Sequence, residues 1–506
     1  MRKLVAAAAI AAAFVSSAGC RRQPPAPRLV LLYAPCTVNR DSLSPYAPGV
    51  PYTPHLAAFA RESVVFARHQ SETDQSGPAY ASILSGAQVD RHGVYRHPAR
   101  LDDRLQLLAE TFAANGYETH FWSGHPMASA QLNYGQGVKP ENVHERRPGV
   151  ADLYALTAND ADFAAILGRL RRDRSLRVFV QVAFTITHGP YTPVDPRAVA
   201  DFRREYPAEW PAIDDAEAAR LARLYTADYL RWQWDYPEVA RERGLTPDER
   251  RRLAAVVGAY YKVSVRLLDH CFGRLVDSVR DAGLLDESLI AFTADHGETL
   301  DRESALFKWT HGAEITPESI EVPLVVRLPG RAPRSGRYEG VTRSIDLHPT
   351  LAGLAGLRAP RAASLVDGVD LSAALAGRAP VPRLSALSHS TLLGPELLAQ
   401  FRGWLVARYH PSTAPDHMWV AVREGDRYTR LRRLEDGAWG FDQFDLARRP
   451  LAEPLPLDPQ GEQRAVAREL EGYKAFLLAR YAEGGAAPTP PDAEARERLR
   501  ALGYIQ

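Results

Sequence analysis

The amino-acid sequence predicts an α/β protein with a mostly parallel central sheet, helices on both faces of that sheet, and a smaller C-terminal α+β subdomain with an antiparallel sheet. Two observations predict the larger part. Short runs rich in β-branched and aromatic residues are typical of strands that are buried on both faces. Amphipathic stretches separate these runs along the chain. A third observation, the change to short strands and turns after about residue 385, predicts the smaller subdomain.

The N-terminal residues have the pattern of an export signal. Arg2 and Lys3 precede an apolar run over residues 4–15, which is too short to cross a bilayer as a mature helix. Small residues then lead to Cys20, as in a bacterial lipobox. We therefore predict a signal peptide over residues 1–20, with Cys20 as the lipidated N-terminus of an exported, periplasmic or cell-surface bacterial lipoprotein. An ordinary cleaved signal peptide is the alternative. Residues 21–27 would form a proline-rich tether.

The segment 28–385 carries the elements of the predicted central sheet. Buried strands are expected in the four apolar runs at residues 28–34, 177–184, 288–294 and 322–328. Apolar residues at helical spacing predict a helix over residues 260–283, ending at Gly283, a residue suited to a helix C-cap. Ligands of such folds collect at the carboxyl ends of strands, so the loops after the first and third runs are expected to converge.

The segment 386–506 is predicted to form the second subdomain. Short antiparallel strands are expected within residues 403–410, 417–434 and 440–446, followed by a helix over residues 461–484. A flexible spacer then precedes a last helix over residues 492–504.

Composition restricts the classes of partner. The 62 Lys and Arg residues balance 61 Asp and Glu residues to a net charge of +1, so nucleic acid is not expected as a partner. The mature chain would keep Cys36 and Cys271, too few for a disulfide framework, so its stability must come from its core. A membrane contact is expected only through the lipid anchor, because no later segment is long and apolar enough to span a bilayer.

Several motifs in a fixed order make the chain recognisable. They read FTADHGETL at residues 292–300, HGAEITPESIEVPLVVRLPG at 311–330, SIDLHPTLAGLAGL at 344–357, and earlier GPAYASILSGAQVDRHGV at 77–94. This ordered set resembles the sulfatase family of the alkaline phosphatase superfamily over about residues 28–506. The resemblance implies cleavage of a sulfate ester by a nucleophile bound to a divalent cation, normally calcium.

The resemblance places the nucleophile at Ser76, two residues before the proline of SGPAYASILSG. In the family this position holds a Cys or Ser that is converted to formylglycine, or an unmodified Ser or Thr in relatives acting on phosphorus. The maturation motif has an Arg where this chain has Tyr80, so we expect Ser76 to be mostly unmodified. The alternative is that Ser76 is an ordinary loop serine beside Gly77.

Further site residues follow from the same resemblance. Asp295 and His296, at the end of a buried strand, match two metal ligands, although such a pair can also form a turn and a helix N-cap. His188 matches the histidine that contacts the sulfate or the leaving oxygen, and His311 matches another site histidine. Lys308 is a candidate for binding the anionic substrate.

Cys36 departs from the family pattern. Relatives carry an essential aspartate ligand at the position where CTVNRDSLSPYA, residues 36–47, begins with Cys36. Calcium prefers hard oxygen donors, whereas a Cys, Asp and His set suits zinc or another borderline metal. The altered site is therefore expected either to bind a different metal or to bind none.

Two functions follow from this pattern. The first is an exported hydrolase of sulfate or phosphate esters, carried by small molecules or glycans, which uses a serine-derived nucleophile and a divalent metal. The second is a catalytically impaired pseudo-sulfatase that keeps the pocket to bind an anionic glycan, lipid or protein partner. The retained histidines favour the enzyme, whereas Cys36 and Tyr80 favour the impaired binder.

Overall fold

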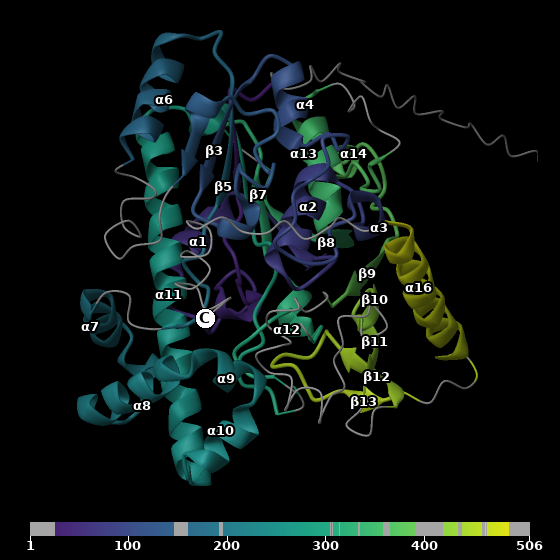
Figure 1. The fold of residues 1–506 in the computed structure, drawn as a ribbon. Helices are drawn as coiled ribbons and strands as arrows, with labels where there is room; N and C mark the ends of the chain where they lie inside the picture. Colours follow the sequence, from purple (N-terminus) through teal and green to yellow (C-terminus); the bar gives the residue numbers. More distant parts are fainter. Residues whose placement is uncertain are drawn as a thin grey trace, which may run out of the picture.

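The computed structural model describes most of the chain (Figure 1). The described residues are 26–145, 160–191, 196–303, 305, 307–312, 314–331, 334–357, 365–390, 418–433, 438–457, 461 and 463–484. The predicted signal peptide with Cys20, the expected strand at 403–410 and the expected helix at 492–504 lie outside them.

The central sheet has eight strands in the order β4-β3-β5-β1-β6-β7-β2-β8. Their bounds are β1 Leu29–Tyr33, β2 Val64–Gln70, β3 Glu118–Ser123, β4 Val143–Glu145, β5 Val178–Ala183, β6 Ser288–Thr293, β7 Leu324–Arg327 and β8 Gly336–Arg343. All four predicted strands are present, as β1, β5, β6 and β7. The sheet is mostly parallel, as expected, with β7 antiparallel to its neighbours β6 and β2.

Strand β1 shows why this sheet needs helices on both faces. Its alternate side chains enter two different cores: Leu29 and Leu31 pack with one cluster, and Val30 and Leu32 with the other. Successive residues of a strand point to opposite faces, so an uninterrupted apolar strand is stable only when both faces are covered.

The helices provide that cover. Their bounds are α1 Pro54–Arg61, α2 Ser76–Ser85, α3 Val89–His92, α4 Leu108–Ala114, α6 Ala161–Arg172, α7 Pro196–Glu205, α8 Asp215–Ala227, α9 Tyr229–Trp234, α10 Tyr236–Glu242, α11 Pro247–Asp281, α12 Pro317–Ile320, α13 Leu347–Leu354, α14 Ser372–Leu375 and α16 Gln463–Gly484. Figure 1 shows α1, α6 and α11 on one side of the sheet and α2, α4, α13 and α14 on the other.

The long helix α11 has clear local signals at both ends. Thr246 caps its N-terminus and forms a capping box with Glu249, and Pro247 occupies the first turn. Gly283, just beyond the C-terminus, has a φ of +70°, which a glycine adopts without steric cost. The helix predicted over residues 260–283 is therefore confirmed, but it begins earlier than predicted.

A second sheet follows the first, as the sequence predicts. It is antiparallel, in the order β13-β12-β11-β10-β9, with bounds β9 Ser385–His389, β10 Val420–Glu424, β11 Arg427–Arg433, β12 Trp439–Asp445 and β13 Leu455–Pro456. Helix α16 covers one face, where Val420 and Leu431 pack with Leu470. On the opposite face, Tyr428 packs with Ile315, which lies in the connection between β6 and α12.

An ion cluster joins the two sheets. The carboxylate of Glu321, just before β7, lies 2.7 Å from Arg423 on β10, 2.6 Å from Arg449 and 3.2 Å from Arg40. Arg40 belongs to the loop that follows β1. The cluster therefore connects the C-terminal sheet to the edge of the central sheet at which ligands of such folds bind. Among the described helices, none is long and apolar enough to cross a bilayer.

Candidate active site

Three chain segments meet at the carboxyl ends of β1 and β6. These strands are adjacent and parallel, with Tyr33 opposite Phe292, so the loops that follow them leave the sheet together. Cys36 follows β1, and Asp295 and His296 follow β6. Ser76 is the first residue of α2, and its hydroxyl oxygen lies 3.1 Å from Nε2 of His296. The structure thus brings the predicted nucleophile and the predicted metal ligands together.

Cys36 lies inside this cluster. Its sulfur is 3.3 Å from Oγ of Ser76 and 3.8 Å from Nε2 of His296. All three side chains and Asp295 are fully buried. Cys36 therefore lies beside the two predicted ligands, and its role as a metal ligand stays a prediction.

The backbone beside Cys36 is strained and firmly held. Thr37 has a φ of +54°, a left-handed conformation that costs a β-branched residue on the order of 1–3 kcal/mol. Its N–H donates to Oδ1 of Asp295 at 3.2 Å, and its carbonyl accepts from the Tyr261 hydroxyl at 2.8 Å. The Thr187 hydroxyl donates to the carbonyl of Cys36 at 2.5 Å. These bonds fix the direction in which the thiol points.

The donor atoms of Cys36, Asp295 and His296 all lie within 4.8 Å of one another, close enough to hold one metal ion. Calcium takes about six to eight oxygen ligands, so a thiol and an imidazole do not fit it. Sulfur, nitrogen and carboxylate oxygen are the donors that zinc takes in proteins. The donor set therefore fits zinc or a similar borderline metal in kind, and does not fit calcium.

Without a metal, the carboxyl group of Asp295 is the one group of Cys36, Asp295 and His296 that can carry a charge near neutral pH. Burial, followed by the Asp295 carboxylate, raises the pKa of the Cys36 thiol well above its ordinary value. Burial also raises the pKa of Asp295 and lowers the pKa of His296 to about 3. The thiol and the imidazole are therefore uncharged near neutral pH.

Hydrogen bonds at the far side of each ring define the histidine tautomers. Nδ1 of His296 lies 2.8 Å from the Gly297 carbonyl, and Nδ1 of His188 lies 2.6 Å from the Gly189 carbonyl. A carbonyl only accepts, so both Nδ1 atoms carry the proton. The lone pair of His296 Nε2 then faces the Ser76 hydroxyl. Nδ1 of His311 faces the Glu298 carboxylate at 3.1 Å.

His188 and His311 join His296 in one cluster. The ring centroids of His296 and His311 are 4.3 Å apart, and those of His188 and His311 are 5.1 Å apart at 78°. His188 and His311 each retain 8% exposure, whereas His296 is fully buried. Burial lowers the pKa of both to about 3. The two outer histidines therefore lie between the buried cluster and solvent.

Two further histidines of this region were missed in the sequence. His97 lies against Gly77, whose N–H donates to its Nδ1 at 3.4 Å, and the ring of His125 lies 5.4 Å from that of Tyr80. Burial, and then the neighbouring histidines His311 and His188 respectively, lower their pKa values well below the ordinary value. His125 follows β3, so its position after a strand was a signal, although no motif marked it.

The structure does not bring Lys308 into this cluster. Its ammonium group contacts the Arg302 carbonyl and lies 3.5 Å from the Asp301 carboxylate. Its backbone N–H donates to the Gln233 carbonyl at 3.4 Å. A role for Lys308 in binding an anion remains a prediction from the sequence.

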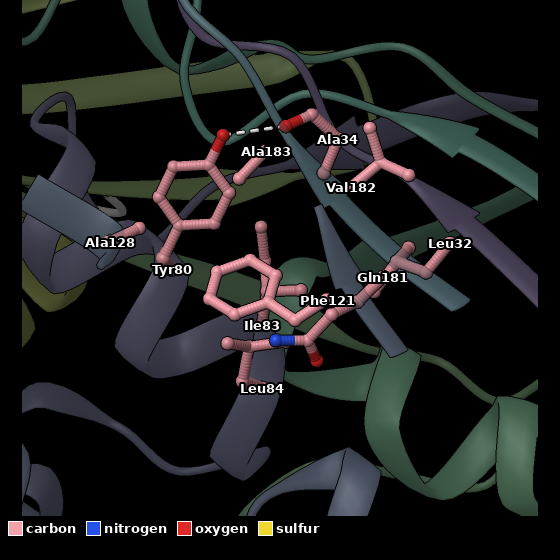
Figure 2. Close-up of a pocket in the computed structure, with 10 residues that line it drawn as sticks. All are labelled: Leu32, Ala34, Tyr80, Ile83, Leu84, Phe121, Ala128, Gln181, Val182 and Ala183. Carbon is pink, nitrogen blue, oxygen red and sulfur yellow. Dashed lines mark hydrogen bonds between the residues drawn. The ribbon is translucent and has the colours of Figure 1, made fainter. Parts of the chain in front are cut away.

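Tyr80 stands where the resemblance to the family predicts an arginine. Figure 2 shows its ring on α2 beside a small apolar cavity, lined by Leu32, Ile83 and Phe121 among others. The hydroxyl donates to the Ala34 carbonyl at 2.5 Å, as the dashed line in Figure 2 shows. Tyr80 therefore links the helix that carries Ser76 to the end of β1, two residues before Cys36.

Comparison with known proteins identifies the family to which this fold belongs. The model of the sulfatase family matches residues 37–357. The choline-sulfatase of Rhizobium meliloti is 25% identical over 414 residues, which cover 74% of this chain and 72% of that protein. The phosphonate monoester hydrolase of Silicibacter pomeroyi has a TM-score of 0.57 and 20% identity, covering 90% of this chain and 95% of its own. A protein solved with its substrate D-glucosamine-2-N,6-O-disulfate has a TM-score of 0.61 and 16% identity, covering 91% and 99%.

The chain belongs to the sulfatase family, whose model spans more than half of it. The recognition, the fold class and the enzyme class predicted from the sequence, a sulfuric ester hydrolase, are confirmed. Members of the family depend on a divalent metal, which is consistent with a metal here but does not identify it.

Proposed function

We propose that this protein is an exported hydrolase of sulfate esters that uses Ser76 as its nucleophile. The observation that carries the proposal is the 3.1 Å approach of the Ser76 hydroxyl to Nε2 of His296, whose Nδ1 proton is held by a carbonyl. A hydroxyl is a weak nucleophile until a neighbouring base accepts its proton. His296 is uncharged near neutral pH and presents its lone pair to that proton.

The chain's own residues account for the proton transfers. The Ser76 oxygen would attack the sulfur atom and release its proton to His296, and the bond from sulfur to the ester oxygen would break. The departing oxygen needs a proton, and His188 and His311 lie where it can be supplied. A bound anion favours the charged form of a nearby imidazole, so substrate would raise their pKa values. Water would then attack the sulfur atom and break its bond to the Ser76 oxygen, His296 would return its proton to that oxygen, and sulfate would leave with a proton of the water.

A divalent metal held by Cys36, Asp295 and His296 would screen the negative charge of the ester. Its ligands suit zinc better than calcium, as the donor set indicates. His296 has one lone pair, on Nε2, because its Nδ1 carries the proton that faces the Gly297 carbonyl. An ion bound there would leave no lone pair for the Ser76 proton, so His296 would act as the base only in the metal-free site. In the metal-bound site, the positive charge of the ion would favour the deprotonated form of the Ser76 hydroxyl.

The names of similar proteins support a class of substrate. Similar proteins are named for choline sulfate and for phosphonate monoesters, and others were solved with a disulfated glucosamine and with a carrageenan oligosaccharide. We propose a sulfated or phosphorylated small molecule or glycan, with sulfate preferred. A membrane-attached location through Cys20 belongs to the same proposal.

A second function remains a candidate because of two substitutions. Cys36 removes a carboxylate from the metal site, and Tyr80 removes the family's arginine. A chain with both changes could keep the histidine cluster to bind an anionic glycan, lipid or protein partner without turnover.

One experiment separates the two functions. The purified protein is assayed with an aryl sulfate and an aryl phosphate, before and after chelation, and its metal content is measured in parallel. Turnover that Ser76→Ala abolishes supports the hydrolase. Saturable binding of sulfated ligands without turnover under any metal supports the impaired binder.

A further inference from the structure

The two outer histidines lie on loops that the central sheet does not join to each other. His188 follows β5, and His311 lies in the long connection between β6 and α12. Loops alone hold side chains less accurately than helices or strands do. Contacts from outside the sheet can therefore help to set the 5.1 Å separation of these two rings.

Helix α9 contacts the first of these loops. Tyr229 lies directly against Gly189, the residue after His188, so that a β-carbon at Gly189 would collide with the Tyr229 hydroxyl and ring. Only glycine permits this approach. Tyr229 is 7% exposed, so its ring is fixed between the helix and the loop.

The same helix contacts the second loop. The side-chain amide of Gln233 donates to the carbonyl of Trp309 at 2.8 Å and to the hydroxyl of Tyr229 at 2.6 Å. Its backbone carbonyl accepts from the N–H of Lys308 at 3.4 Å. Trp309 lies two residues before His311, so Gln233 links the His311 loop to the residue that supports the His188 loop.

The Trp309 backbone needs this support. Its φ is +52°, an uncommon conformation for a residue other than glycine. Its buried ring lies edge-on to Tyr225 at 5.5 Å and to Tyr236 at 5.4 Å. Tyr225 also stacks on Tyr191, three residues after His188, at 6.2 Å. The segment α8–α10 therefore contacts both loops. Its contacting residues Tyr225, Tyr229 and Gln233 are spaced four residues apart.

We propose that Tyr229 and Gln233 are positioning residues that set the separation of His188 and His311 through the backbones of Gly189 and Trp309. Neither residue needs to touch the substrate. The catalytic consequence rests on the proposed function, because it assumes that the two histidines serve hydrolysis. The positional consequence does not depend on it.

The test reads the histidines directly. Protein labelled with ¹³C in its histidine rings is compared by NMR as wild type, Gln233→Ala and Tyr229→Phe, with His188→Asn and His311→Asn identifying the two signals. Arg241→Ala is the matched control, since Arg241 lies on α10, is 71% exposed and pairs only with its helix neighbour Glu238 among the described residues. Thermal unfolding shows that each variant is folded.

The expected result is that Gln233→Ala shifts the signals of both His188 and His311, while Arg241→Ala shifts neither. Tyr229→Phe, which deletes a single oxygen atom, should shift both histidine signals by a smaller amount. It replaces Gln233→Ala in the test if that variant does not fold. With a hydrolysed aryl ester, kcat should fall by about 10- to 100-fold in Gln233→Ala, with a smaller change in KM.

Unchanged imidazole signals in folded Gln233→Ala, or in Tyr229→Phe if only that variant folds, would overturn the positioning role. Equal shifts in Arg241→Ala would overturn it too, because they would show a general response of the helical segment. If wild-type protein hydrolyses no ester, the proposed function fails, while the NMR comparison still decides whether α9 positions the histidines.

Discussion

The sulfur atom of Cys36 lies 3.3 Å from the hydroxyl oxygen of Ser76, with both side chains fully buried. The residue at position 36 therefore determines the immediate surroundings of the proposed nucleophile. A protonated thiol supplies neither charge nor a hard oxygen, whereas a carboxylate there would supply both.

Ser76→Ala is expected to reduce ester hydrolysis by at least about 10³-fold, because the attacking oxygen is removed. The fold should be unchanged, since a methyl group fits the space of the hydroxymethyl group. Initial rates with an aryl sulfate measure the effect, and Ser85→Ala on the same helix is the control. Retention of more than a few per cent of the activity would reject Ser76 as the nucleophile. The mass of the peptide that contains Ser76 shows whether it is converted to formylglycine, and we expect it mostly unmodified.

Replacing Tyr80 by the arginine expected from the family should destabilise the protein. Tyr80→Arg places a guanidinium among apolar side chains and should lower the free energy of unfolding by on the order of 3–5 kcal/mol. Tyr80→Phe loses the hydrogen bond to the Ala34 carbonyl, at a cost of about 1–3 kcal/mol. Urea denaturation compares the two. A stable Tyr80→Arg protein with higher turnover would show that the cavity in Figure 2 accommodates the charge.

The ion cluster at Glu321 predicts a specific acid sensitivity. Burial alone would raise its pKa, but Arg40, Arg423 and Arg449 outweigh burial and hold the pKa of Glu321 at about 2. Its stabilising contribution is therefore present above about pH 4.5 and is lost as the pH falls through about 2. Glu321→Gln should destabilise the protein by about 3–5 kcal/mol at pH 7 and by progressively less below pH 4.5.

The measurement for this prediction is a set of denaturation curves between pH 7 and pH 2. Glu339→Gln is the control, because Glu339 is 59% exposed and pairs with Arg68 at the surface, where an ion pair contributes about 0–1 kcal/mol. Wild type and Glu321→Gln that stay parallel over the whole range would contradict the role of the three guanidinium groups.

Lipidation at Cys20 predicts that the full-length protein remains with the membrane fraction until detergent is added. Several acyl chains anchor a protein far more firmly than one. Cys20→Ser should be released into the soluble periplasmic fraction or stay as an uncleaved precursor. Quantitative detergent-free release of the wild type would instead support an ordinary cleaved signal peptide.

Sequence patterns predicted the sheet well where single strands carry their own signal. The run that became β1 is apolar throughout, which is enough to place it in the middle of a parallel sheet. The direction of β7 was not predictable in this way, because a short buried run such as LVVR reads the same in either orientation. Edge strands such as β4, only three residues long and half-buried, leave almost no pattern.

The candidate site divides in the same way. The sequence predicted five residues of the site, and the structure gathers all five: Ser76 begins a helix, His188, Asp295 and His296 follow strands, and His311 begins a long motif. His97 and His125 were missed because each lies in a short segment without a motif. The supports at Tyr229 and Gln233 were not predictable, since they depend on how the segment α8–α10 folds onto two distant loops.

The metal bound by Cys36→Asp, compared with that bound by wild type, tests the altered site most directly. Both proteins are purified identically, equilibrated with calcium and zinc, and analysed for metal content and for aryl sulfatase activity. We predict that wild type holds zinc or no metal, and that Cys36→Asp gains calcium together with a modest increase in sulfatase activity. Wild type that holds calcium stoichiometrically, or a substitution that changes neither metal content nor turnover, would contradict this view of the site.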